Sequence, residues 1–287
     1  MLSGFTLIRN AVNLNFPVVA SIRSILEVCD EVVVNVGKSD DATRDLVAGI
    51  GDPRIRIIDT VWDMSKGDRT LAAETARAMA ACRGSWGLYI QADEVLEESG
   101  ARILKAKVAE WDREPIVEGL LVEYLHFYGG FETIATNRRW YAREVRCIRL
   151  GKDIHPYQGA QGFRVGPGQR KIRARPTGAV MFHYGWARPA PAINEKLQIT
   201  QTMYPWAAGR LEQARQRETL DWIPLLRHFS GSHPAAAREW IAQSKQQPQL
   251  AIAAPRFNAS HLRYYISDWI ERLTGARPFE FRNYVIV

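Results

Sequence analysis

The chain has 287 residues, which is enough for one large domain or two small ones with a substantial core. A hydrophobic fraction of 46% and a charged fraction of 24% are typical of a soluble globular protein, and no apolar run approaches the roughly 18 residues of a membrane-spanning helix. Residues 1–150 carry 19 basic against 22 acidic side chains and residues 151–287 carry 19 against 9, so the net charge of +7 comes from the second half. This asymmetry predicts an anionic partner there; the alternative is a basic surface that only aids solubility.

The N-terminus and the cysteines favour the cytoplasm. Residues 1–8 lack the basic start and long apolar core of a signal peptide and are typical of a first strand. The three cysteines, Cys29, Cys82 and Cys147, have no metal-ligand spacing, and an odd number suits a reducing compartment. We therefore expect a cytoplasmic protein.

Predicted strands and helices alternate through the first 115 residues. The predicted strands are Phe5–Ile8, Glu31–Val36, Ile55–Ile58 and Trp86–Ile90, and the predicted helices are Val18–Val28, residues 43–49, Ala72–Cys82 and Ser99–Trp111. This alternation predicts an α/β fold with a doubly wound parallel sheet. Ligands of such sheets bind beyond the carboxyl ends of the strands, where Arg9, Asn10, Asn35 and Asp93 are expected.

The pattern changes after residue 115. Further strands are predicted at Val117–Phe127, Glu144–Leu150 and Ala179–His183, around a glycine-rich stretch at Gly159–Gly168. From Ala190 onward the chain has helical stretches that are broken by prolines. We therefore expect a helical C-terminal extension.

An apolar strand runs directly into adjacent carboxylates at Tyr89–Leu96, where Asp93 and Glu94 follow the strand. Carboxylates at the edge of a sheet can hold Mg²⁺ or Mn²⁺ together with substrate phosphates. The alternative is a solvated turn or a helix N-terminus, where acidic residues are common.

Several well-known motifs are missing. No G-x-G-x-x-G follows the first strand and no G-x-x-x-x-G-K-[ST] occurs, which argues against dinucleotide dehydrogenases and P-loop NTPases. Neither G-x-S-x-G nor H-E-x-x-H is present.

Six sequence pieces, taken in order, resemble a family 2 glycosyltransferase with the GT-A fold. They are Arg9-Asn10; the segment 35–43, similar to D-D-G-S-x-D-x-T; Gly84-Ser85-Trp86 leading to Gln91-Ala92-Asp93-Glu94, similar to G-D-W…D-A-D-E; Trp140-Tyr141 with Glu144-Val145-Arg146; residues 160–164; and residues 183–189. The Q-A-D-E and H-Y-G-W sequences resemble one subgroup of that family. The resemblance covers about residues 5 to 196.

The resemblance implies an inverting transfer of a sugar from a nucleotide-sugar donor to a glycan or lipid-linked acceptor, as in cell-surface polysaccharide synthesis. It implies a Rossmann-like, mostly parallel sheet flanked by helices. Residues 1–115 would form the nucleotide-sugar-binding half, residues 116–190 the acceptor-binding half, and residues 191–287 the helical extension. The basic second half suits an anionic acceptor or peripheral contact with the inner face of an anionic membrane; no nucleic-acid-binding signature is present.

The resemblance also assigns site residues. Those expected to bind the donor are Arg9, Asn10, Asn35, Gln91, Ala92 and Asp93. Lys66 and Arg69, in the loop after the third strand, are expected either to contact the donor or to be simple surface charges. Asp93 and His183 would hold the Mn²⁺ or Mg²⁺, and the imidazole favours Mn²⁺. The alternative for His183, which ends an apolar strand, is a hydrogen-bonded histidine of the core. Gln91 stands where the wider family has the first aspartate of D-x-D, and Asn35 where it has the aspartate that contacts the base, so donor identity stays open.

The proton acceptor is expected between residues 151 and 183. No Asp or Glu occurs between Asp153 and Glu195, which leaves Asp153 and His155 as candidate bases if His183 binds metal. Glu144 and Glu132 are the alternatives.

Two other function classes compete with this interpretation. The first is a catalytically inactive GT-A-like module that binds an anionic surface; the retained Asp93 argues against it. The second is a sugar nucleotidyltransferase, which the absence of a glycine-rich, lysine-bearing N-terminal loop disfavours.

Overall fold

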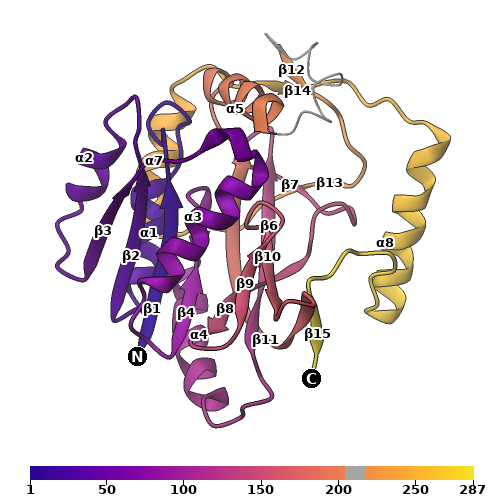
Figure 1. Cartoon of the computed structure of the whole chain (residues 1–287). Helices are drawn as coiled ribbons and strands as arrows, with labels where there is room; N and C mark the ends of the chain where they lie inside the picture. Colours follow the sequence, from indigo (N-terminus) through magenta and orange to yellow (C-terminus); the bar gives the residue numbers. More distant parts are fainter. Residues whose placement is uncertain (204–217) are drawn as a thin grey trace.

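The computed structural model describes residues 1–203 and 218–287 and has an α/β fold built on one large, mixed β-sheet (Figure 1). The main path of the sheet follows the order β3-β2-β1-β4-β8-β6-β11-β10-β9. This confirms the predicted fold class.

The first 115 residues supply four parallel strands and the helices beside them. The strands are β1 (Leu2–Ile8), β2 (Glu31–Gly37), β3 (Ile55–Thr60) and β4 (Trp86–Tyr89), followed by the short β5 (Glu94–Leu96). The helices are α1 (Val18–Leu26), α2 (Thr43–Ala48), η1 (Met64–Lys66), α3 (Asp68–Ala80) and α4 (Glu98–Trp111). Strand β1 pairs in parallel with β2 and β4, and all three are buried along their length, which explains their continuous apolar runs.

The sheet becomes mixed beyond β4. Its next strands are β6 (Gly119–Tyr128), β7 (Thr133–Ala135), β8 (Arg143–Arg149), β9 (Ile154–Tyr157), β10 (Gly162–Val165) and β11 (Arg170–Trp186). Strand β8 is antiparallel to both neighbours, β4 and β6, whereas β6 and β11 are parallel. Strand β11 has 17 residues and starts well before the predicted Ala179. The prediction missed its first half because these residues are charged and do not show the apolar pattern of a buried strand.

The register between β5 and β11 brings two distant motifs together. Strand β5 runs antiparallel to β11, and Glu94 lies opposite His183. The backbone N–H of Tyr184 also donates to the carbonyl oxygen of Asp93 (2.8 Å). The acidic turn after β4 is therefore held against the end of β11.

Packed layers cover both faces of the sheet. Apolar side chains of α1 and α4, such as Ile22, Ile25 and Leu104, pack on one face. On the other face Ala78 of α3 packs with Ile154 and Phe163 of the β9–β10 hairpin. The acidic turn after β4 therefore lies at the edge of a sheet that is packed on both faces.

The C-terminal residues are partly helical, as expected, and also extend the sheet. They form α5 (Ala190–Met203), β12 (Thr219–Leu220), β13 (Leu226–His228), η4 (Ala235–Ala237), α7 (Arg238–Lys245), β14 (Ala251–Ile252), η5 (Ala259–His261), α8 (Leu262–Thr274) and β15 (Tyr284–Ile286). Strand β13 pairs with β7, and β15 pairs in parallel with β11. None of the described helices has the length and hydropathy needed to span a bilayer.

Candidate active site

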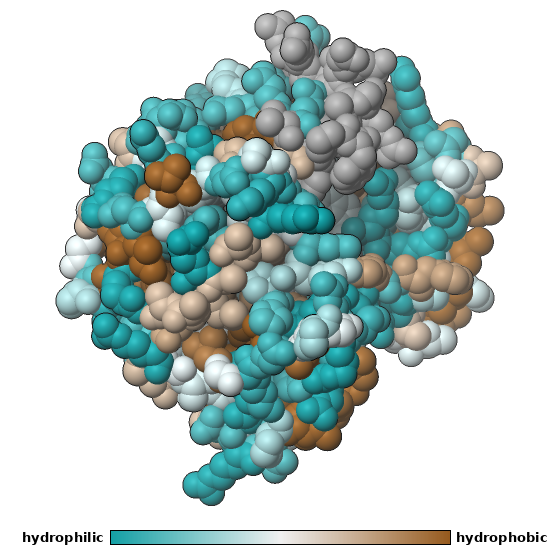
Figure 2. All heavy atoms as spheres, viewed as in Figure 1, coloured by the Kyte–Doolittle hydropathy of each residue, from teal (hydrophilic) through white to brown (hydrophobic). Residues whose placement is uncertain are grey.

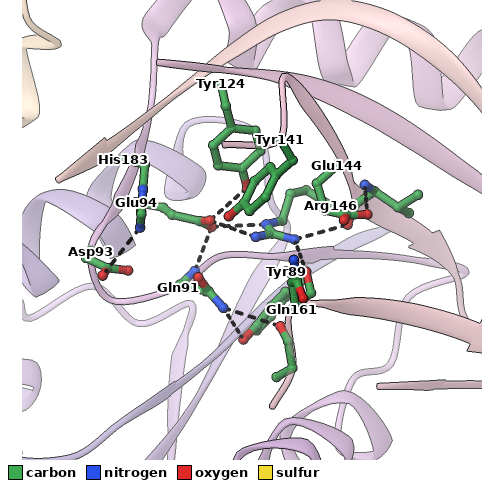
Figure 3. A network of polar contacts seen from close by, with 12 residues as sticks. Tyr89, Gln91, Asp93, Glu94, Tyr124, Tyr141, Glu144, Arg146, Gln161 and His183 are labelled. Atoms are coloured by element: carbon green, nitrogen blue, oxygen red, sulfur yellow. Dashed lines mark hydrogen bonds and ion pairs between the residues drawn. The ribbon is translucent and has the colours of Figure 1, made fainter. Parts of the chain in front are cut away.

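A buried polar network fixes the turn that follows β4 (Figure 3). The Glu94 carboxylate accepts hydrogen bonds from both Arg146 Nη2 (2.8 Å) and Nε (3.1 Å), and neither side chain is exposed to solvent. It also accepts from the Tyr124 hydroxyl (2.7 Å) and the backbone N–H of Gln91 (3.0 Å). All its hydrogen bonds are thus made within the protein, so Glu94 positions the turn and does not face a ligand.

Arg146 links this turn to the β9–β10 hairpin. Its Nη1 donates to the carbonyl oxygen of Gln161 (3.0 Å), and its guanidinium lies over the rings of Tyr89 and Tyr124. Gln91 reaches the same hairpin, since its Nε2 donates to the carbonyl oxygen of Ala160 (3.3 Å). Strand β4, the hairpin and the acidic turn are therefore one connected unit.

Asp93, next to this network, faces His183. The two side chains are largely buried, and Asp93 Oδ2 lies 3.6 Å from His183 Nε2, which is too far for a hydrogen bond. Burial alone would raise the pKa of Asp93, but His183, Lys196 and Arg188 lower it well below its usual value. Asp93 is therefore a carboxylate at neutral pH.

Hydrogen bonds behind His183 determine which of its nitrogens is free. His126 Nε2 contacts the carbonyl oxygen of Tyr141 (2.8 Å), which can only accept, so His126 carries its proton on Nε2. Burial lowers the pKa of His126 and keeps it neutral. Its Nδ1 then accepts from Nδ1–H of His183 (2.8 Å), so the neutral tautomer of His183 that can bind a metal has its lone pair on Nε2, the nitrogen that faces Asp93.

Gly185 keeps the space between Asp93 and His183 open. A Cβ atom at this position would lie 2.7 Å from His183 Nε2 and 3.0 Å from Asp93 Oδ2. Among the residues that the structure describes, no group of three or more His, Cys, Asp or Glu side chains could hold a metal ion. Two protein ligands suit a cation that completes its coordination with substrate phosphates and water, as Mg²⁺ does in many phosphate-binding sites.

A cavity of about 310 Å³ opens in front of Asp93, at the carboxyl ends of β1 and β4. It contains five of the predicted donor-binding residues, namely Arg9, Asn10, Gln91, Ala92 and Asp93. Asn10 has a left-handed backbone (φ 51°), which asparagine tolerates better than most residues. The ends of the two strands thus bring these five residues to one cavity.

Three predicted donor-binding residues do not line this cavity. Asn35 is completely buried, where its amide donates to the Glu74 side chain (2.9 Å) and its oxygen accepts from Thr60 (2.5 Å). Lys66 is exposed and pairs with Asp63 (3.2 Å), and Arg69 is also exposed.

The two predicted bases lie at the far end of the β9–β10 hairpin. Asp153 and His155 are exposed and hydrogen-bonded to each other. Gly159, at the opposite end of that hairpin, lines the cavity. His155 is four residues from Gly159, and four residues of extended chain span about 13 Å. The structure therefore does not bring Asp153 and His155 to Asp93. The alternative Glu144 is buried against Asn283 (2.7 Å), and Glu132 pairs with Lys245 (3.2 Å).

Sequence reasoning missed Lys196 of α5, which also lines the cavity. Its Nζ donates to the carbonyl oxygen of Gly185 (2.9 Å) and lies over the Trp186 ring (4.8 Å). Burial, with a smaller contribution from Arg188, lowers the pKa of Lys196 to about 7. A bound anion would favour its charged form. A single lysine in a helical segment gives no sequence signal for this role.

A second cavity, of about 560 Å³, is lined by Trp186, whose ring contacts Lys196 of the first cavity. Its lining is rich in aromatic rings: Tyr128, Trp140, Trp186, Trp222, His261 and Tyr264. Arg139, Asp221 and Arg263 add polar groups.

No protein-family model and no curated protein sequence matches this chain. Among solved structures, "S. aureus TarS 1-349" is similar over 75% of this chain and 69% of its own, with 12% identity and a TM-score of 0.42. Glucosyl-3-phosphoglycerate synthase from Mycobacterium tuberculosis, solved with Mn²⁺, uridine diphosphate and phosphoglyceric acid, matches 44% of this chain and 43% of its own, with 17% identity and a TM-score of 0.30. In another TarS structure the match spans only 22% of the neighbour's length.

Proposed function

We propose that this chain is a metal-dependent, inverting glycosyltransferase of the hexosyltransferase type. The donor is a nucleotide sugar, and the acceptor is a glycan or a lipid-linked glycan of a cell-surface polysaccharide. In this proposal residues 1–115 bind the donor, residues 116–190 contribute the acceptor side, and residues 191–287 complete both cavities. The observation that carries the proposal is the gap between Asp93 Oδ2 and His183 Nε2, kept open by Gly185 beside the cavity.

The residues around the gap suit a nucleoside diphosphate. Asp93 and His183 would hold Mn²⁺ or Mg²⁺, and the cation would neutralise charge on the departing diphosphate. Arg9 and Lys196 line the same cavity and can bind phosphate oxygens. Phe16 and Trp62 offer apolar faces for the nucleoside.

Inversion requires the acceptor hydroxyl to attack the anomeric carbon from the side opposite the diphosphate. The aromatic cavity neighbours the donor cavity, because Trp186 lines the former and contacts Lys196 of the latter, so it can supply that side. Aromatic faces pack against the apolar faces of sugar rings, which supports a glycan acceptor there.

A thermal-shift panel tests the proposed donor class. UDP-sugars, GDP-sugars and NAD⁺ would each be added with Mn²⁺ or with EDTA. We expect stabilisation by one nucleotide-sugar class that is largest with Mn²⁺, because binding to the native state raises the melting temperature. Stabilisation by none of them would contradict the proposal and favour an inactive binding module.

Replacing Trp222 tests the acceptor cavity. We expect Trp222→Ala to raise the KM for a soluble oligosaccharide acceptor about tenfold, since one aromatic face is lost, and to leave donor affinity unchanged. Trp111→Ala is the matched control, because Trp111 lies on α4 and lines neither cavity. Equal KM values for both variants would place the acceptor elsewhere.

Asp153 and His155 remain the predicted base. We expect Asp153→Asn and His155→Ala to leave donor affinity unchanged, because neither residue lines the donor cavity. If the prediction is right, one of the two variants loses most of its turnover at saturating donor, since the hydroxyl proton must be accepted as the bond forms. Near-wild-type turnover of both variants would place the base elsewhere.

A further inference from the structure

Helix α8 carries a continuous apolar stripe that faces away from the protein. The stripe is defined by Leu262, Tyr265, Ile266, Trp269 and Leu273, at the i, i+3, i+4, i+7 and i+11 spacing of one helical face. Trp269 and Leu273 are 63% and 65% exposed. Phe257 extends the stripe, because its ring lies 6.2 Å from that of Tyr265.

The opposite face of α8 attaches the helix to the protein. Tyr264 and Ser267 are 5% and 3% exposed, and the Ser267 hydroxyl donates to the carbonyl oxygen of Pro278 (3.3 Å). Helix α8 lies at the outer edge of the molecule in Figure 1, and apolar residues gather along that edge in Figure 2. An amphipathic helix normally turns its apolar face to the core, so the reversed orientation indicates an external apolar partner.

The charges around the stripe are sorted by sign. Asp268 is only 14% exposed and pairs with both Arg227 and Arg272 (2.9 Å for Arg272). Arg272 itself is 63% exposed, and Arg256 and Arg263 are also exposed. The second acidic residue of α8, Glu271, pairs with Arg277 (3.4 Å). Both acidic groups of the helix are thus paired, while cationic groups flank the apolar stripe, as in helices that lie in the interface of anionic membranes.

We propose that the apolar stripe of α8 docks on the surface of an anionic lipid bilayer. The 13-residue helix is about 20 Å long and about 10 Å wide, so the stripe is a narrow apolar strip. A stable protein interface is typically a broader face, whereas a narrow apolar strip flanked by exposed arginines matches the surface of an anionic bilayer. An interfacial helix needs only its own apolar face, with Trp and Tyr at the headgroup level. The inference names a surface for the predicted peripheral membrane contact and does not depend on the transfer reaction.

Co-sedimentation of the full chain with vesicles tests this proposal. The vesicles are phosphatidylcholine alone, or phosphatidylcholine with an equal part of phosphatidylglycerol. We expect binding to the anionic vesicles, and about tenfold or greater loss of it in Trp269→Ser with Leu273→Ser. Arg256→Gln with Arg272→Gln should remove the preference for anionic vesicles and leave residual binding to both compositions.

Matched variants separate docking from other effects. Leu46→Ser with Ile116→Ser, which replaces exposed apolar residues elsewhere, should bind vesicles like the wild type. Asp93→Ala should also bind them normally, so a failed donor site and a failed docking surface give different results. Equal melting temperatures would show that the α8 variant is folded. The proposal is overturned if the wild type binds no vesicles, if the α8 variant binds as well as the wild type, or if sedimentation equilibrium shows a dimer that this variant abolishes.

Discussion

Arg146→Met is expected to lower the free energy of unfolding by about 3–5 kcal/mol, because it leaves the Glu94 carboxylate buried without its cation. Glu94 and Arg146 are both completely buried, and the pair makes two hydrogen bonds. Urea unfolding followed by circular dichroism measures the change.

Two further variants test whether the pair is the cause. Glu94→Gln combined with Arg146→Met should be clearly more stable than the sum of the two single changes predicts, since the unpaired charge is removed. Lys107→Met breaks the exposed Lys107–Glu110 pair (2.7 Å) and should cost less than about 1 kcal/mol. Similar losses for Arg146→Met and Lys107→Met would contradict the role given to the buried pair.

Gly185→Ala is expected to lower the turnover number about 100-fold or more and to remove the effect of Mn²⁺ on donor binding. The new methyl group would occupy the gap between His183 Nε2 and Asp93 Oδ2, at 2.7 Å and 3.0 Å from these atoms. A loss of 100-fold corresponds to about 2.7 kcal/mol of transition-state stabilisation, within the several kcal/mol that a bound cation contributes.

The control for this change is Gly168→Ala, where a Cβ atom meets no heavy atom within 4 Å. Both variants would be assayed with saturating acceptor over a range of Mn²⁺ concentrations. Full activity of Gly185→Ala at any Mn²⁺ concentration would show that the gap does not hold a cation.

The parallel half of the fold could be predicted because its strands are buried on both faces. Apolar runs such as Val32–Val34 leave little choice of structure, and the ends of β1 and β4 then bring Arg9, Asn10 and Asp93 together. The length of β11 could not be predicted, because its first half is charged.

The roles of individual side chains at the site were harder to predict. Asp93 and Glu94 are adjacent in sequence, yet one faces the cavity and the other is buried against Arg146, a distinction that only the register with β8 and β11 makes. The strand of Asn35 was predicted correctly, but its predicted role in donor binding was not supported, because its amide donates to Glu74 inside the protein. His126 belongs to no recognisable motif, because its role depends on a contact with His183 on the neighbouring strand.

Calorimetric titration of UDP and of GDP, each in Mn²⁺ and in EDTA, tests the central claim most directly. We predict that one of the two diphosphates binds at least about tenfold more tightly in Mn²⁺, because Asp93, His183 and the phosphates share the cation. Asp93→Ala should bind that diphosphate equally weakly under both conditions. Equal affinity of the wild type for each diphosphate in Mn²⁺ and in EDTA would contradict a metal-dependent donor site.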